Sequence, residues 1–179
     1  MSETDGEATA GETTGGKRGK LRQVAVIGAG RCEVGLEPWL LAEEVGGRLA
    51  QAGVAVVCGG LGGIMEAACR GAAGAGGTAI GIVPGGSVAE ANPYCTHVVA
   101  TGIGYARNLA VVSSGDVVIA VTGEWGTLSE IGYARAIGRT VVTLQSWSLV
   151  GREEMEGAPG LVPVDDAEGA VAAALEALA

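Results

Sequence analysis

The sequence of 179 residues contains only two lysines, Lys17 and Lys20, and both lie among the first 20 residues. The rest of the chain therefore has no lysine for a Walker A phosphate-binding motif. It also has none to form a Schiff base with pyridoxal phosphate. These absences exclude a P-loop nucleotide site and a pyridoxal-phosphate enzyme from the compact region.

Histidine is nearly absent, and cysteine occurs without metal-binding spacing. His97 is the single histidine, and no two of the four cysteines form a C-x-x-C pair. Structural zinc sites normally need four ligands at short spacings, so we expect no bound metal. The cysteines are interpreted as reduced thiols of a cytoplasmic protein. His97 lies in a predicted strand and no G-x-S-x-G motif accompanies it, which favours a structural role over a catalytic triad.

Basic residues are outnumbered, with 11 Lys and Arg against 20 Asp and Glu and a net charge of −9. A protein that tracks a phosphate backbone normally presents a basic face, so we expect no nucleic-acid partner. No apolar run reaches the ~18–20 residues of a membrane span. The first 19 residues lack the apolar segment of a signal peptide. We therefore expect a cytoplasmic protein without a membrane partner.

Hydrophobic residues make up 48% of the chain, which is enough to build a core, and glycine is unusually frequent at 33 residues. Average proteins contain about 7% glycine, so many tight turns or close approaches of backbone to a ligand are indicated. Residues 1–20 have no hydrophobic period and are predicted to be a disordered tail. A single domain is predicted over residues 21–179.

Short Val- and Ile-rich runs alternate with helical stretches along this domain. The runs are continuous rather than alternating, which is typical of strands buried on both faces of a parallel sheet. The predicted strands are 24–27, 54–57, 79–83, 97–100, 116–121 and 140–144. The predicted helices are 38–52, 63–75, 105–113, 127–137 and 167–178, with a polar connector over 151–163. We therefore predict an open, doubly wound, Rossmann-like α/β domain with a mostly parallel sheet and helices on both faces.

The first predicted strand is followed by Gly28 and Gly30, whose backbone N–H groups are candidates for phosphate binding. The G-x-G-x-x-G dinucleotide motif fails because Glu33 occupies the third glycine position. No acidic residue at the end of the second strand is placed for a ribose hydroxyl either. We therefore expect no NAD.

A second glycine loop precedes the helix predicted from residue 63. Such a loop lets the backbone approach a ligand, and the helix N-terminus favours an anion there. The predicted phosphate-binding residues of this segment are Gly59, Gly60, Gly62, Gly63, Met65 and Glu66. Two alternatives stay open, namely close strand–helix packing of the glycines and a surface ion pair between Glu66 and Arg70.

A third loop, after the fifth predicted strand, contains Gly123, Glu124, Gly126, Thr127 and Glu130. The first four are predicted to bind the ligand, and Glu130 is a candidate catalytic carboxylate. The alternative is a capping box, in which Thr127 caps the helix and Glu130 reaches back to it.

Arg107 and Asn108 lie near the start of a short apolar helix. The arginine is suited to bidentate recognition of a phosphate or carboxylate, and the asparagine is predicted to contact the same ligand. The alternative is an arginine that is merely solvated at the start of the helix.

Taken in order, these motifs resemble the Lonely-guy (LOG) family, whose Rossmann-like members were long labelled lysine decarboxylases. The resemblance covers about residues 23–149. Its motifs are Gly59-Gly60-x-Gly62-Gly63-Ile64-Met65-Glu66, Thr101-Gly102, Arg107-Asn108 and Gly123-x-x-Gly126-Thr127-x-x-Glu130. It implies a small phosphorylated ligand and a homodimer or higher homo-oligomer. For the hydrolases of the family it implies cleavage of the N-glycosidic bond of cytokinin nucleoside 5′-monophosphates, with Glu130 and Arg107 as catalytic residues.

Two positions depart from the hydrolase pattern, because Asn108 stands where that pattern has lysine and Glu124 where it has a second glycine. With residues 91–94, they resemble a neighbouring branch that includes molybdenum cofactor carriers and relatives of DNA-processing proteins. Three functions follow as hypotheses. The first is binding or carriage of a nucleotide or the molybdenum cofactor, with no cofactor required. The others are a phosphoribohydrolase acting on cytokinin or purine nucleoside monophosphates and a nucleotide-sensing regulatory domain.

Overall fold

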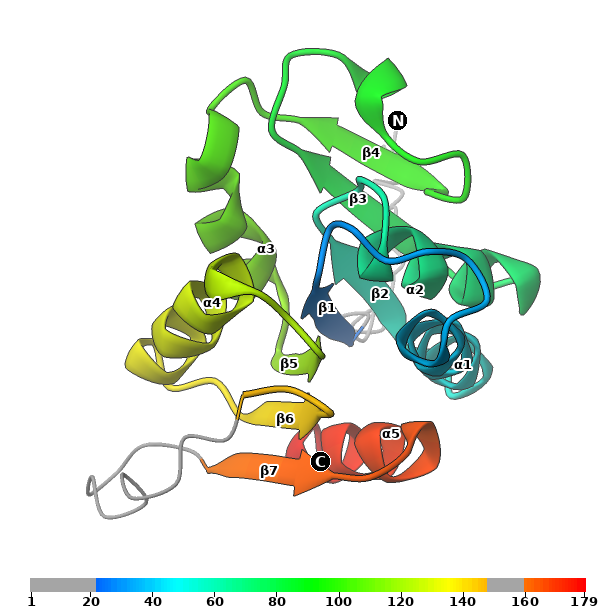
Figure 1. Cartoon of the computed structure of the whole chain (residues 1–179), viewed down its shortest axis with the longest axis vertical. Helices are drawn as coiled ribbons and strands as arrows, with labels where there is room; N and C mark the ends of the chain where they lie inside the picture. Colours follow the sequence, from blue (N-terminus) through cyan, green and yellow to red (C-terminus); the bar gives the residue numbers. More distant parts are fainter. Residues whose placement is uncertain (1–21, 148–159) are drawn as a thin grey trace, which may run out of the picture.

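A computed structural model describes residues 22–147 and 160–179, which fold around one parallel sheet (Figure 1). Its seven strands have the order β4-β3-β2-β1-β5-β6-β7, and every neighbouring pair is parallel. The strands are β1 (Gln23–Gly28), β2 (Ala55–Cys58), β3 (Ala79–Val83), β4 (His97–Ala100), β5 (Val117–Val121), β6 (Val141–Leu144) and β7 (Leu161–Val164). The predicted open α/β fold is confirmed, and the sheet is parallel throughout the described residues.

Helices cover both faces of the sheet (Figure 1). Helices α1 (Glu37–Gln51), α2 (Ile64–Gly74) and α5 (Ala167–Ala177) lie on one face, and α3 (Arg107–Ser114) and α4 (Trp125–Ala136) lie on the other. Two short 3₁₀ turns are present, η1 (Val88–Glu90) and η2 (Gly104–Ala106). One hydrophobic cluster fills each side of the sheet, which explains why the central strands are apolar at every position.

The order of the strands reverses between β1 and β5. From β1 the chain continues through α1 to β2 and then to β3 and β4, while β5 to β7 extend the sheet on the other side. The loop after β1 leads to one face and the loop after β5 leads to the opposite face, so a crevice opens between them. The glycine loops after β1, β2 and β5 all lie at this end of the sheet.

The edge strands differ in how well the sequence predicted them. Strand β4 is confirmed, and its exposed His97 shares a hydrogen bond of 3.0 Å with the Thr96 hydroxyl. Strand β7 begins within the segment 151–163 that we predicted as a connector and ends one residue after it, so that prediction is wrong for its last three residues. The strand has only four residues, and one of them, Pro163, lacks an N–H donor and fits only an edge. Residues 148–159 lie outside the described part of the chain.

The start of α4 also differs from the prediction, because the helix begins at Trp125 rather than at Thr127. Its N-cap is Glu124, whose side chain makes no capping hydrogen bond. Thr127 is therefore in the first turn and Glu130 in the second, so the predicted capping box is wrong. The buried Thr127 side chain instead packs over Gly123, where an added Cβ would lie 2.5 Å from its Cγ2.

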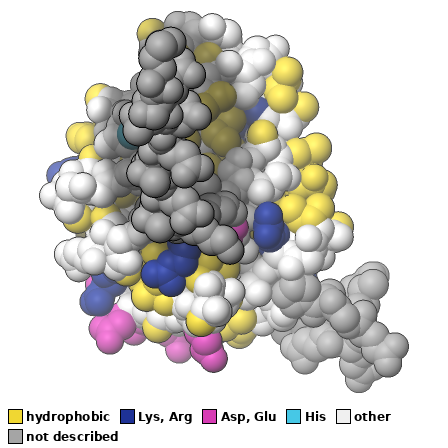
Figure 2. Space-filling view, turned by 180° about the vertical axis from the view of Figure 1, so that it is seen from behind, with side chains coloured by type: hydrophobic (Ala, Val, Ile, Leu, Met, Phe, Trp, Pro, Cys, Tyr) yellow, Lys and Arg dark blue, Asp and Glu magenta, His cyan; other side chains and the backbone are white. Residues whose placement is uncertain are grey.

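The surface seen in Figure 2 mixes charges of both signs. Dark blue and magenta side chains lie next to one another near its lower margin rather than as one basic area. Ion pairs in the described residues include Arg48–Glu44 and Arg70–Glu43, at 2.8 and 3.3 Å. No helix in the described residues is long and apolar enough to cross a membrane.

Candidate functional site at the strand-order reversal

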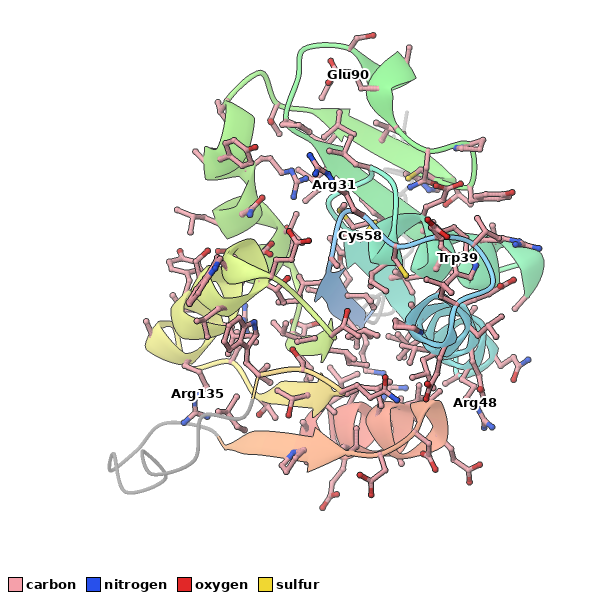
Figure 3. The ribbon with its side chains drawn as sticks, in the orientation of Figure 1. Arg31, Trp39, Arg48, Cys58, Glu90 and Arg135 are labelled. Atoms are coloured by element: carbon pink, nitrogen blue, oxygen red, sulfur yellow. The ribbon has the colours of Figure 1, made fainter. Side chains whose placement is uncertain are left out.

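A cavity of about 600 Å³ lies beyond the carboxyl ends of β1 and β5. It is lined by Ala29, Gly30, Arg31, Cys32, Glu33, Leu36, Pro38 and Thr122. Arg31 lies at the same end of the sheet, as Figure 3 shows. Thr122, directly after β5, has a φ of 51°, an uncommon conformation for a residue with a side chain. Strained backbone of this kind often occurs at ligand sites.

Arg107 is held inside this end of the domain rather than in solvent. It is the first residue of α3, and only 7% of it is exposed. Its guanidinium lies over the Cα of Gly59, since a Cβ added there would be 2.6 Å from the guanidinium carbon. Its NH1 group donates a hydrogen bond of 2.8 Å to Asn108 Oδ1, while the buried Nε has no hydrogen-bond partner in the described chain. A charged donor is therefore buried beside the second glycine loop.

Glu130 is the second buried charged group at this end of the domain. It is 8% exposed, and its carboxylate makes no hydrogen bond or ion pair with the described residues. Burial raises its pKa to about 7, although the Arg107 charge opposes this shift. Burial in turn lowers the pKa of Arg107, against the attraction of Glu130. The two residues proposed from the sequence as catalytic thus lie close enough to interact electrostatically.

The predicted glycines separate into two groups by the space around them. A Cβ would clash with backbone or buried side chains at Gly28, Gly60, Gly63 and Gly123, so close packing explains these four. In contrast, Gly30 and Gly62 have only ordinary contacts, and Gly126 has nothing within 4 Å. No packing constraint in the described structure requires glycine at these three positions.

The second glycine loop leaves backbone donors free. The amides of Leu61, Gly62 and Gly63 make no hydrogen bond within the described residues, whereas Ile64 donates to Ala29 O at 3.0 Å. That last bond fixes the second loop to the first. Three consecutive free amides before a helix are typical of an anion-binding site.

Asn92 holds the second glycine loop in place. Its side-chain amide donates to Gly60 O at 3.1 Å and Leu61 O at 3.0 Å, and its backbone N–H donates to Gly60 O at 2.7 Å. We did not include Asn92, Arg31 or Thr122 among the predicted site residues. Arg31 and Thr122 could have been found from their places directly after predicted strands. Asn92 could not, because it reaches the loop only through tertiary packing.

A family model for the SLOG cluster4 family matches residues 21–170. The chain belongs to that family. A protein of Archaeoglobus fulgidus is 40% identical over 126 residues, which are 70% of this chain and 82% of the relative. This assignment confirms the resemblance to LOG-like Rossmann proteins seen in the sequence.

Solved structures similar to this SLOG cluster4 protein include two that bind or carry the molybdenum cofactor. The molybdenum cofactor binding protein of Rippkaea orientalis is 28% identical with a TM-score of 0.80, covering 89% of this chain and 99% of that one. The molybdenum cofactor carrier protein of Chlamydomonas reinhardtii is 29% identical with a TM-score of 0.79, with the same coverage. DNA processing protein A of Helicobacter pylori, at 18% identity and a TM-score of 0.63, shares the fold.

The remaining predicted residues of this SLOG cluster4 site have mixed surroundings. Met65 is buried in the core. Glu66 forms no ion pair with Arg70, which instead pairs with Glu43 at 3.3 Å, so that alternative is wrong. The Glu124 side chain is exposed and makes no hydrogen bond in the described structure, while its carbonyl accepts one from Trp147 Nε1 at 3.3 Å.

Two tryptophans lie at the start of α4, and an exposed tyrosine lies just before α3. Trp125 is exposed and packs against Trp147 in a tilted arrangement, with ring centroids 5.2 Å apart and an interplanar angle of 39°. Tyr105, in η2, is almost fully exposed. In the described residues no group of three or more His, Cys, Asp or Glu side chains is arranged to bind a metal ion.

Proposed function

We propose that this protein binds a small phosphorylated ligand with a ring system, of the class to which nucleotides and the phosphorylated pterin of the molybdenum cofactor belong, and acts as its carrier. The observation that carries the proposal is Arg107, a buried guanidinium laid over Gly59 beside three free backbone amides. Arg107 forms no ion pair with a carboxylate in the described residues, and only the charge of Glu130 acts on it from a longer distance, so an anionic ligand would compensate the buried guanidinium. The similarity to two molybdenum cofactor proteins supports the pterin as the first ligand to test.

The donor set of the site fits a terminal phosphate. Arg107 would contribute charged donors, and the amides of Leu61, Gly62 and Gly63 would contribute neutral ones. Gly59 leaves room for the guanidinium, because any side chain at that position would displace it. The cavity of about 600 Å³ is lined by the first glycine loop and Thr122 rather than by Arg107 or the second-loop amides, and its volume lies within the range of pockets that hold small organic ligands. A carrier would hold the molybdenum cofactor without reacting with it. The cofactor would supply its redox chemistry in the enzyme that receives it.

The test is the identity of the ligand that the protein retains. The full chain would be purified from cells that make the cofactor, and the released ligand would be measured by pterin fluorescence and by molybdenum content. We expect pterin in substantial stoichiometry and a large loss in Arg107→Gln. Arg70→Gln is the matched control, because it removes a half-exposed arginine on the helix α2 that follows the loop. Equal ligand content in Arg107→Gln and Arg70→Gln would refute the proposal.

A second candidate function, hydrolysis of an N-glycosidic bond, is favoured by Glu130 alone. A buried carboxyl whose pKa is raised to about 7 is poised to exchange protons near neutral pH. In its ionised form it would stabilise the oxocarbenium character that develops at the anomeric carbon. Water would add to that carbon while the base leaves with a proton.

This candidate is tested by chromatography for free base after incubation with AMP and an N6-substituted AMP. Release of base that falls by roughly 10²-fold or more in Glu130→Gln would support a phosphoribohydrolase. No release above the variant's background, from folded protein, would exclude hydrolysis of these substrates.

A further inference from the structure

Three of the four cysteines gather beneath the second glycine loop, although they are far apart in the sequence. Cys58 ends β2, Cys69 is on α2, and Cys95 precedes β4. The sulfurs of Cys58 and Cys69 are 3.3 Å apart, and those of Cys69 and Cys95 are 3.6 Å apart. All of them are free thiols. Cys58 is labelled in Figure 3 at the end of its strand.

The three thiols differ in access to solvent. Cys58 and Cys69 are buried, whereas Cys95 is only partly buried. Hydrogen bonds from the Cys58 and Cys69 thiols lower the pKa of Cys95, and Asn92 adds to this effect. The same contacts raise the pKa of Cys69. Negative charge is therefore favoured on the outermost sulfur of the cluster, where a dissolved oxidant can reach it.

We propose that Cys95 and Cys69 form a reversible disulfide when the protein meets a peroxide, with Cys95 as the residue that is oxidised first. The Cys95 thiolate attacks one oxygen of hydrogen peroxide. The O–O bond breaks, and Cys95 becomes a sulfenic acid while the other oxygen leaves as water after protonation. The Cys69 sulfur then attacks the sulfenic sulfur and releases a second water. Two thiols are oxidised, one peroxide is reduced, and a dithiol reductant reverses the change.

Contact between sulfurs is what makes this pair suitable. A disulfide needs its sulfurs about 2.05 Å apart, so a separation of 3.6 Å can be closed by side-chain rotation and a small shift of the loop. Cys95 lies in the short loop between Asn92 and β4, outside regular structure. A shared metal ion is a poorer explanation of the cluster, since no group of potential ligands in the described residues is arranged for one.

The test uses the full chain, reduced and then treated with hydrogen peroxide. We expect two of the four thiols to be lost, the intact mass to fall by two hydrogens, and peptide mapping to join Cys69 to Cys95. The change should reverse with dithiothreitol. Cys32→Ser should behave as the wild type, because Cys32 has no sulfur neighbour in the described chain. Cys95→Ser should retain its remaining thiols under the same treatment.

Any other product would overturn the inference. A bond between Cys58 and Cys69, a disulfide between two chains through Cys32, or sulfinic acid at Cys95 without a bond to Cys69 would each do so. These readouts are covalent and do not depend on ligand binding. The decisive readout is the peptide map of the oxidised wild-type protein. The test therefore stands even if the Cys95→Ser variant fails to fold.

One consequence rests on the proposed function. Gly60 N donates to Cys58 Sγ at 3.3 Å, and Asn92, which holds Gly60 and Leu61, is three residues before Cys95. A Cys69–Cys95 bond would therefore shift the loop that we assign to phosphate. We expect the oxidised protein to bind AMP several-fold more weakly than the reduced protein. Unchanged affinity would remove this coupling, while failure to bind AMP in both states would count against the proposed function and leave the disulfide in place.

Discussion

At the residue scale, the proposed site depends on Gly59, because the Arg107 guanidinium occupies the space that a side chain at that position would fill. Any Cβ at Gly59 would overlap the Arg107 guanidinium, so Gly59→Ala should expel the arginine from its buried position. Charged hydrogen bonds are worth about 1.5–3 kcal/mol, so we expect the affinity for AMP to fall by roughly 10- to 100-fold. Isothermal titration calorimetry measures this loss directly.

Gly74→Ala is the control for that experiment. Gly74 is the last residue of α2, and a Cβ there would meet nothing within 4 Å. The affinity of Gly74→Ala for AMP should equal that of the wild type. An unchanged affinity in Gly59→Ala, with the fold verified by circular dichroism, would mean that Arg107 does not contact the ligand.

The raised pKa of Glu130 predicts that the folded protein loses stability as the pH rises toward neutral. Its pKa is raised from 4.5 to about 7 by burial, so the folded state retains a proton that the unfolded state loses. The stabilisation is complete below pH 4.5 and is lost as the pH rises to about 7. The shift corresponds to a loss on the order of 3 kcal/mol over this range. Denaturant titrations at pH 5 and pH 8 measure it.

Glu130→Gln should remove this dependence, because a neutral amide of similar shape has no proton to lose. The variant should therefore be more stable than the wild type at pH 8 and close to it at pH 5. The reverse order at pH 8 would show that the ionised carboxylate is stabilised in the folded protein, and that Arg107 outweighs burial.

At the scale of elements, α1 and α2 approach each other through glycines. A Cβ at Gly46 would lie 2.9 Å from the carbonyl carbon of Ala68, within the packed interface of the two helices. Glycine to alanine inside a helix normally stabilises by about 0.5–1 kcal/mol, but overpacking costs about 1–3 kcal/mol. We expect Gly46→Ala to lower the free energy of unfolding by about 1–2 kcal/mol in a urea titration.

Gly132→Ala is the matched substitution without a neighbour. Gly132 is exposed in α4, and a Cβ there would meet nothing within 4 Å. It should raise the free energy of unfolding by about 0.5–1 kcal/mol. If both substitutions stabilise the protein equally, the helices have room to move apart and close packing does not explain Gly46.

Patterns that depend on one segment alone were predicted well from the sequence. Six strands followed from continuous apolar runs, and β4 was recognised although it is short and exposed at alternate positions. Strand β7 was missed because it is an edge strand of four residues with a proline, which leaves little local signal. The start of α4 was misplaced because Thr127 and Glu130 match a capping box in sequence, while packing over Gly123 decided the actual start.

Candidate site residues were predictable where they follow strands, since the carboxyl ends of parallel strands meet at one edge. That reasoning located Arg107 and Glu130, which the fold brings within electrostatic reach. It could not tell which glycines are required by packing, as at Gly28, and which face open space, as at Gly126. Nor could it place three distant cysteines in one cluster, because that depends on how α2 packs against β2 and the loop before β4.

At the scale of the whole molecule, the proposed ligand site depends on the same loops and contacts that hold the fold together. The loops after β1, β2 and β5 converge at the reversal of strand order, and the bond from Ile64 to Ala29 joins two of them. A ligand that bridges these loops binds only the folded chain. Binding should therefore stabilise the entire domain by mass action rather than one loop.

Thermal unfolding gives the measurement at this scale. At a free concentration of AMP 100-fold above its dissociation constant, the gain is about 2.7 kcal/mol, which corresponds to a rise of roughly 5–10 °C in a domain of this size. Arg107→Gln should lose most of the rise. Arg48→Gln should keep it, because Arg48 pairs with Glu44 and Glu168 on the opposite part of the molecule from Arg31 (Figure 3). Equal shifts in both variants would place the nucleotide elsewhere, since the stabilisation would then not pass through the buried guanidinium.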